Sequence, residues 1–127
     1  MERKIIATAA FLGMTAVILG AFGAHGLKPV LEPEHLSTFE TGARYQMYHA
    51  ILLLFVGLST CRESVKRYVF YLVLIGIIFF SGSLYLLSTA AVTGIAVNKI
   101  GIITPIGGLL LIIGWLMLFI EFIRKKS

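Results

Sequence analysis

Gly20-Ala21-Phe22-Gly23-Ala24-His25-Gly26 closes the first long apolar run of the chain with small residues gathered around one histidine. The run before it carries no charge from Ile5 onward. A helix needs about 20 apolar residues to cross the roughly 30 Å hydrocarbon core of a bilayer. Residues 5–25 are therefore expected to form a transmembrane helix. Lipid gives no reason for a histidine among glycines, so we expect another helix to pack there.

The composition of the whole chain excludes an ordinary soluble domain. Of its 127 residues, 58% are hydrophobic and 13% are charged, and the mean hydropathy is +0.95. A soluble domain of this size could not bury so much apolar surface. The net charge is +5, but the basic residues stand at the ends of apolar runs, where they act as membrane anchors and do not form a nucleic-acid patch. The single cysteine, Cys61, excludes an intramolecular disulfide and does not indicate a metal cluster.

Three further apolar runs predict transmembrane helices over residues 45–61, 68–90 and 102–123. The chain is thus expected to be one all-α domain over residues 1–127, an integral membrane four-helix bundle. The alternative for the first run is a cleaved signal peptide, with Ala21-Phe22-Gly23 as its cleavage site. The run is longer than the usual apolar core of a signal peptide, which favours a retained helix.

The segment between the first two apolar runs has the pattern of a short amphipathic helix. Residues 34–44 place Leu36, Phe39 and Ala43 on one helical face. We expect this segment to lie in the membrane interface, with Gly42 bending it into the second span. One continuous helix is the alternative.

The distribution of basic residues predicts the orientation. Four spans place both termini and the loop between the second and third spans on one side of the membrane. That side carries eight basic residues and the other side carries Lys28, Arg44 and Lys99. The positive-inside rule therefore places both termini in the cytoplasm, with the chain in the plasma membrane. The eight are Arg3, Lys4, Arg62, Lys66, Arg67, Arg124, Lys125 and Lys126.

The polar residues of the apolar runs are expected to collect in the outer half of the bundle. Tyr45 and His49 are four residues apart, so they share a face of the second helix. The predicted polar cluster or pocket comprises His25, Arg44, Tyr45, Gln46, His49, Ser81, Ser83, Tyr85 and Thr104. Small residues at helical spacing allow close contact between membrane helices. The predicted packing positions are Ala16, Gly20, Gly23, Ala24, Gly82, Gly107 and Gly108.

Four segments together resemble one known family. They are Gly20-Ala21-Phe22-Gly23-Ala24-His25-Gly26-Leu27, Tyr45-Gln46-Met47-Tyr48-His49-Ala50, Phe80-Ser81-Gly82-Ser83-Leu84-Tyr85, and Thr104-Pro105-Ile106-Gly107-Gly108 with Gly114-Trp115. The chain resembles the small membrane family catalogued as domain of unknown function 423, to which eukaryotic transmembrane protein 256 is similar. The resemblance implies a four-helix integral membrane protein and no established activity.

The function expected from these residues is that of a structural or accessory membrane component. Neutral histidines and their neighbours would then join helix ends by hydrogen bonds. The first alternative is a site at the same cluster that binds or transports a small molecule, a lipid or an ion, with Arg44 at its mouth. A less favoured alternative is a haem held by His25 and His49, although no cofactor is expected.

Catalysis is not expected. Ser81, Ser83 and His49 could form a nucleophile and base, but no carboxylate is predicted at their depth to orient the histidine. Glu121 is expected at the cytoplasmic end, paired with Arg124 or Lys125. The expected partner is the lipid bilayer. A second copy or another membrane protein is also compatible with the small-residue faces, because these serve equally within and between subunits.

Overall fold

The protein is all-helical. The computed structural model describes residues 1–124, so the basic residues Lys125 and Lys126 that entered the orientation argument lie outside the described part. Its elements are α1 Glu2–Phe22, the π-helical turn η1 Gly23–Leu27, α2 Pro33–Leu58, α3 Glu63–Thr93 and α4 Ile100–Arg124.

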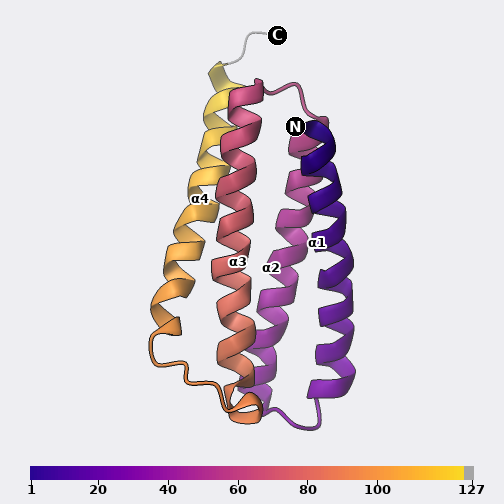
Figure 1. Cartoon of the computed structure of the whole chain (residues 1–127), viewed down its shortest axis with the longest axis vertical. Coiled ribbons are helices and arrows are strands. Elements are labelled where there is room, and N and C mark those ends of the chain that lie inside the picture. Colours follow the sequence, from indigo (N-terminus) through magenta and orange to yellow (C-terminus); the bar gives the residue numbers. More distant parts are fainter. Residues whose placement is uncertain (125–127) are drawn as a thin grey trace.

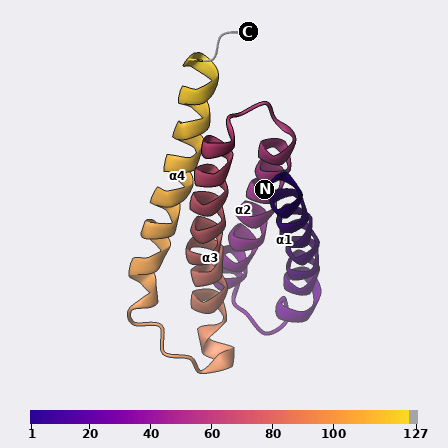
Figure 2. The same cartoon turned by 45° about the horizontal axis from the view of Figure 1, so that its top comes forward.

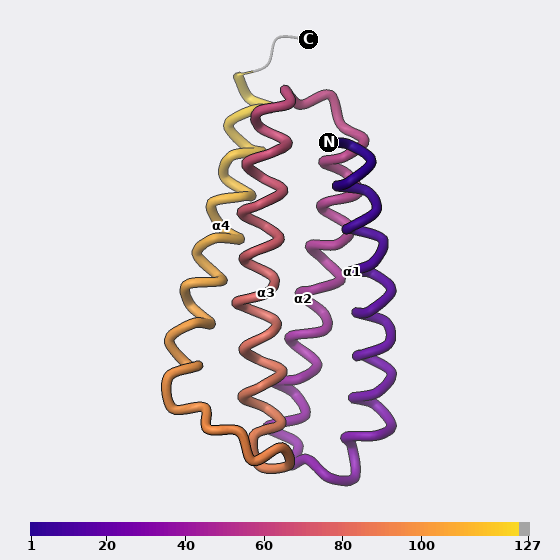
Figure 3. Tube along the Cα trace, in the orientation of Figure 1, coloured from indigo at the N-terminus to yellow at the C-terminus, as the bar shows by residue number. Residues whose placement is uncertain are grey.

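The four long helices run side by side along one axis, and consecutive helices are antiparallel (Figures 1 and 3). α1 packs on α2, α2 on α3, and α3 on α4. α1 and α4 lie at opposite edges in both views (Figures 1 and 2). We call the end that holds Glu2, the α2–α3 turn and Arg124 the terminal end. The end that holds η1, the start of α2 and the α3–α4 connection is the loop end.

The main hydrophobic core lies between α1, α2 and α3 and extends to Leu111 and Leu118 of α4. Ile5, Leu53, Val56, Val69 and Val73 are fully buried in it. A smaller apolar cluster at the loop end joins η1 to α2. Many large apolar side chains instead point outward. Such a surface is unfavourable in water and favourable in lipid.

Three segments are long and apolar enough to cross a membrane: Glu2–Leu27, Glu63–Thr93 and Ile100–Arg124. This agrees with three of the predicted spans. α2 has the length, but its first half carries polar residues and it does not meet the same criterion. α2 nevertheless lies between α1 and α3 along the bundle (Figure 2).

Residues 34–44 are not a separate helix. They form the first part of α2, which starts with Pro33 in its first turn and continues through Gly42. The continuous helix considered as the alternative is therefore the one observed. Gly42 is needed for close packing, since a Cβ there would lie 2.8 Å from the Tyr85 ring. Its role is to admit α3, where the sequence had suggested a bend.

Candidate functional site

Gln46 joins three helices through its side-chain amide. It is only 5% exposed on α2. Its Nε2 donates to the Leu12 carbonyl oxygen at 2.9 Å and to Thr15 Oγ1 at 2.7 Å, both on α1. Its Oε1 accepts a hydrogen bond of 2.7 Å from the Tyr85 hydroxyl of α3. Both ends of the amide are thus used within the protein.

His49 connects α2 to α4. Its Nδ1 lies 2.7 Å from the Tyr45 carbonyl oxygen, and Trp115 donates its indole N–H to Nε2 at 3.1 Å. A carbonyl only accepts and an indole N–H only donates, so the ring is a neutral imidazole with its proton on Nδ1. Neither ring nitrogen is left without a partner. Trp115 was not among the predicted site residues, although a partly buried indole N–H usually requires an acceptor.

The hydroxyl groups of α3 make two further interhelical contacts. Ser81 is buried and donates to the Gly42 carbonyl oxygen of α2 at 2.7 Å. The hydroxyls of Ser83 and Thr104 share a hydrogen bond of 2.6 Å between α3 and α4. The predicted polar residues Gln46, His49, Ser81, Ser83, Tyr85 and Thr104 therefore all contribute to contacts between helices.

His25, Arg44 and Tyr45 have different surroundings. The His25 side chain is exposed in η1. Arg44 is exposed and its guanidinium lies 4.0 Å from the Glu40 carboxylate on the same helix. The Tyr45 ring is partly exposed and packs near Phe80.

The two histidines lie at different depths. A Cβ on Gly23, two residues before His25, would be 2.9 Å from Phe39, which places η1 beside that part of α2. His49 is ten residues further along α2, a rise of about 15 Å. The structure therefore does not bring His25 to His49. The expected common layer required a separate interfacial segment before the second span, whereas α2 begins beside η1.

The predicted packing positions fall into two groups. Gly23 and Gly107 are tightly enclosed, and a Cβ on Gly107 would overlap the backbone of Phe80 on α3. Ala16 is also buried. These residues lie where helices approach closely, as expected of small residues in membrane helices.

The other predicted packing positions are not enclosed. A Cβ on Gly20 or Gly82 would meet nothing within 4 Å, and one on Gly108 would make ordinary contact with Phe80 at 3.6 Å. Ala24 is exposed. Close packing also occurs at glycines that were not predicted: a Cβ on Gly76, Gly57 or Gly114 would lie within 2.8 Å of a side chain of a neighbouring helix.

Arg44 and several of these small residues border a groove between α1 and α2. Its volume is about 360 Å³. It is lined by Ala16, Gly20, Ala24, Glu40, Ala43, Arg44 and Met47. Arg44, the cationic residue expected at the mouth of the polar cluster, therefore borders a groove that none of the other predicted polar residues lines.

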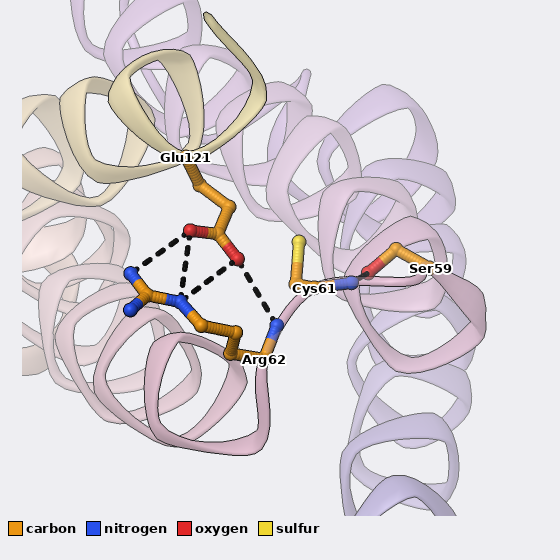
Figure 4. Close-up of polar contacts among 4 residues, drawn as sticks. All are labelled: Ser59, Cys61, Arg62 and Glu121. Carbon is orange, nitrogen blue, oxygen red and sulfur yellow. Dashed lines mark hydrogen bonds and ion pairs between the residues drawn. The ribbon is translucent and has the colours of Figure 1, made fainter. Parts of the chain in front are cut away.

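Two ion pairs close the terminal end. Glu121 of α4 is buried and accepts hydrogen bonds from the Arg62 backbone N–H and from its guanidinium, both at 3.0 Å (Figure 4). Lys66 of α3 is 2% exposed, and its ammonium group donates to the Glu2 carboxylate at 2.7 Å. The sequence suggested Arg124 or Lys125 as the partner of Glu121. The structure shows that Arg62 is a partner of Glu121. Lys125 lies outside the described residues.

Comparison with known proteins places this architecture in a family. The profile of a protein family of unknown function, DUF423, matches residues 19–108. A UPF0382 membrane protein of Staphylococcus saprophyticus is 49% identical over 93% of this chain and 95% of its own length. One from Haemophilus influenzae is 44% identical over 100% and 99%, and one from Bacillus subtilis is 40% identical over 96% and 98%. No solved structure matches the chain. The chain therefore belongs to the DUF423 family of membrane proteins, as the resemblance of its four motifs indicated.

Proposed function

We propose that this chain is a non-enzymatic structural or accessory protein of the plasma membrane, and that all four of its helices cross the bilayer. The packing of α2 supports its assignment as a membrane-spanning helix in addition to the other three. α2 is 26 residues long and packs on α1 and on α3, each of which lies in a segment able to cross a membrane. A helix between two spanning helices shares their depth. Its polar residues Gln46 and His49 are buried, and membrane proteins place such side chains inside the bundle.

The orientation follows from the charges at the two ends. Six basic residues of the described chain lie at the terminal end: Arg3, Lys4, Arg62, Lys66, Arg67 and Arg124. By the positive-inside rule this end faces the cytoplasm.

The observation that carries the structural role is the set of three hydrogen bonds made by Gln46. A ligand site in the membrane interior would be expected to present polar atoms that are free to bind. Within residues 1–124, every buried side-chain nitrogen and oxygen already has a hydrogen-bond partner. These contacts fix which faces of α1, α2 and α3 meet, and so define the register of the bundle.

The hydrogen bonds of the polar residues support ligand binding, haem binding and catalysis less well than they support a structural role. A ligand, lipid or ion at the polar cluster would have to displace contacts of Gln46 or His49 that join helices. A haem held by both histidines would need two ligands at one level, but His25 lies near Phe39 and His49 is about 15 Å further along α2. Catalysis by Ser81 or Ser83 would require the hydroxyl to donate its proton to a base, and both hydroxyls donate instead to backbone carbonyl oxygens.

The experiment that tests the proposal is thermal unfolding of Gln46→Leu in detergent. The variant keeps the side-chain volume roughly constant and removes the three bonds, so unfolding should occur at a lower temperature than in the wild type. Ser37→Ala, an exposed position on the same helix, is the matched control and should unfold like the wild type. Equal stability of Gln46→Leu and the wild type would overturn the structural role.

A further inference from the structure

An apolar groove runs along the outer surface between α2 and α4. Its volume is about 600 Å³. Of the interhelical hydrogen bonds described above, only the one between Trp115 and His49 involves a residue that lines it. Five of its lining residues are aromatic. The groove is lined by Tyr48, Ile51, Leu52, Phe55, Trp115, Leu118, Phe119, Phe122 and Ile123.

The length and position of the groove match one leaflet of a bilayer. On α4 it extends from Trp115 to Ile123, which precedes Arg124, the last residue of the helix. The eight helical steps from the first to the last of these residues correspond to a rise of about 12 Å, and half of a hydrocarbon core is about 15 Å. The groove therefore runs from the terminal-end surface to about the middle of the membrane. At that depth the Trp115–His49 hydrogen bond joins its two walls.

The charge at the open end of the groove is positive. Arg124 follows Ile123 directly and is exposed. The terminal end keeps an excess of positive charge after its two ion pairs are counted, because the described residues there include six basic and three acidic side chains. A basic surface at the membrane interface attracts anionic lipid head groups.

We propose that the α2/α4 groove binds one acyl chain of an anionic phospholipid from the leaflet at the terminal end. The chain would lie along the aromatic lining toward Trp115, with the phosphate near Arg124. The positive end favours a lipid over a second protein helix, which would need only the apolar wall. The inference rests on the four-span arrangement but not on the role of Gln46, so either proposal can fail alone.

Trp115 is the only tryptophan of the chain, so its fluorescence reports directly on this groove. The experiment reconstitutes the full-length protein in phosphatidylcholine vesicles that contain either brominated phosphatidylglycerol or brominated phosphatidylcholine at the same mole fraction. Bromine quenches tryptophan on contact. We expect the anionic lipid to quench with an apparent affinity about five-fold higher, the gain expected from one basic residue near the surface. Higher salt should reduce this preference.

Two substitutions test the head-group and acyl-chain contacts separately. Arg124→Gln should bring the ratio of the two affinities toward one, while Arg67→Gln, exposed at the same end on α3, should preserve it. Ile51→Phe should fill part of the groove and weaken quenching by both lipids. Val17→Phe on the exposed face of α1 is its control and should leave quenching unchanged.

Equal quenching by the two lipids in the wild-type protein would overturn the proposal, because it would indicate ordinary surface lipid. Quenching by neither lipid would overturn it as well, since a second copy or another helix would then cover the groove. An unchanged preference in Arg124→Gln would contradict the position assigned to the head group.

Discussion

The hydroxyl of Tyr85 on α3 donates a hydrogen bond of 2.7 Å to Oε1 of Gln46 on α2, while the Nε2 of the same amide is bonded to α1. One side chain thus connects helices that lie far apart in the sequence. Tyr85→Phe removes this bond alone and should lower the free energy of unfolding by about 0.6 kcal/mol, the average for interhelical bonds in a membrane protein, and by at most about 1.7 kcal/mol. Thermal or steric-trap unfolding in detergent measures it. Stability equal to the wild type would show that the bond contributes nothing.

The Trp115–His49 contact gives a second prediction. Trp115→Phe retains an aromatic ring but removes the N–H donor, so it should destabilise the α2–α4 contact by about 0.6 kcal/mol. His49→Ala should cost more, because it removes the bond and the packed ring together. The two variants are compared by thermal unfolding. A larger loss in Trp115→Phe than in His49→Ala would argue against this assignment.

Gly107 and Gly82 form a matched pair, because a neighbouring helix packs closely against the first and not against the second. A Cβ at Gly107 would overlap the backbone of Phe80, so Gly107→Ala should force α3 and α4 apart and cost about 1 to 3 kcal/mol. A Cβ at Gly82 meets nothing within 4 Å. Gly82→Ala should therefore be neutral or stabilising by up to about 1 kcal/mol, because alanine is the better helix former. Equal effects of the two substitutions on the unfolding temperature would contradict the observed packing.

The buried ammonium group of Lys66 makes Glu2 important for stability. Glu2→Gln leaves a buried positive charge without its counter-charge, whereas Lys66→Met removes that charge and keeps an apolar chain. Glu2→Gln should therefore lower the unfolding temperature more than Lys66→Met does, and the double variant should resemble Lys66→Met. The reverse order would show that Lys66 does not depend on Glu2.

The orientation is testable in intact cells. In a Cys61→Ser background, Lys28→Cys at the loop end should react with a membrane-impermeant maleimide, and Arg67→Cys at the terminal end should react only after lysis. Labelling of both positions in intact cells would contradict the proposed four spans. Labelling of Arg67→Cys alone would reverse the orientation.

The sequence was sufficient to predict an all-helical membrane protein, because long uncharged runs leave few alternatives in a membrane, but it did not show where α2 begins. It also identified Gln46, His49, Ser81 and Tyr85 as polar residues inside the bundle. It did not locate their partners. Depth along α2 depends on where that helix begins, and the pattern of residues 34–44 suited an interfacial helix as well as the first turns of α2. With α2 starting at Pro33, Gln46 lies beside Thr15.

The partners of Trp115 and Arg62 could not be predicted from the sequence either. An aromatic residue on an apolar helix is expected to face lipid, and nothing in the sequence reveals that its N–H reaches His49. Arg62 lies in a basic stretch that was interpreted as a topological anchor, whereas its pairing with Glu121 depends on how α3 and α4 pack. Both contacts join residues that are far apart in the sequence, so they depend on how the helices pack.

A double-mutant cycle on Gln46 and Tyr85 tests most directly whether the polar cluster is structural. The free energy of unfolding is measured for the wild type, Gln46→Leu, Tyr85→Phe and the double variant. If the two side chains stabilise the bundle through their mutual bond, Tyr85→Phe should cost less in the Gln46→Leu background, with a coupling energy of about 0.5 kcal/mol or more. Strictly additive losses, or no loss in either single variant, would contradict this account.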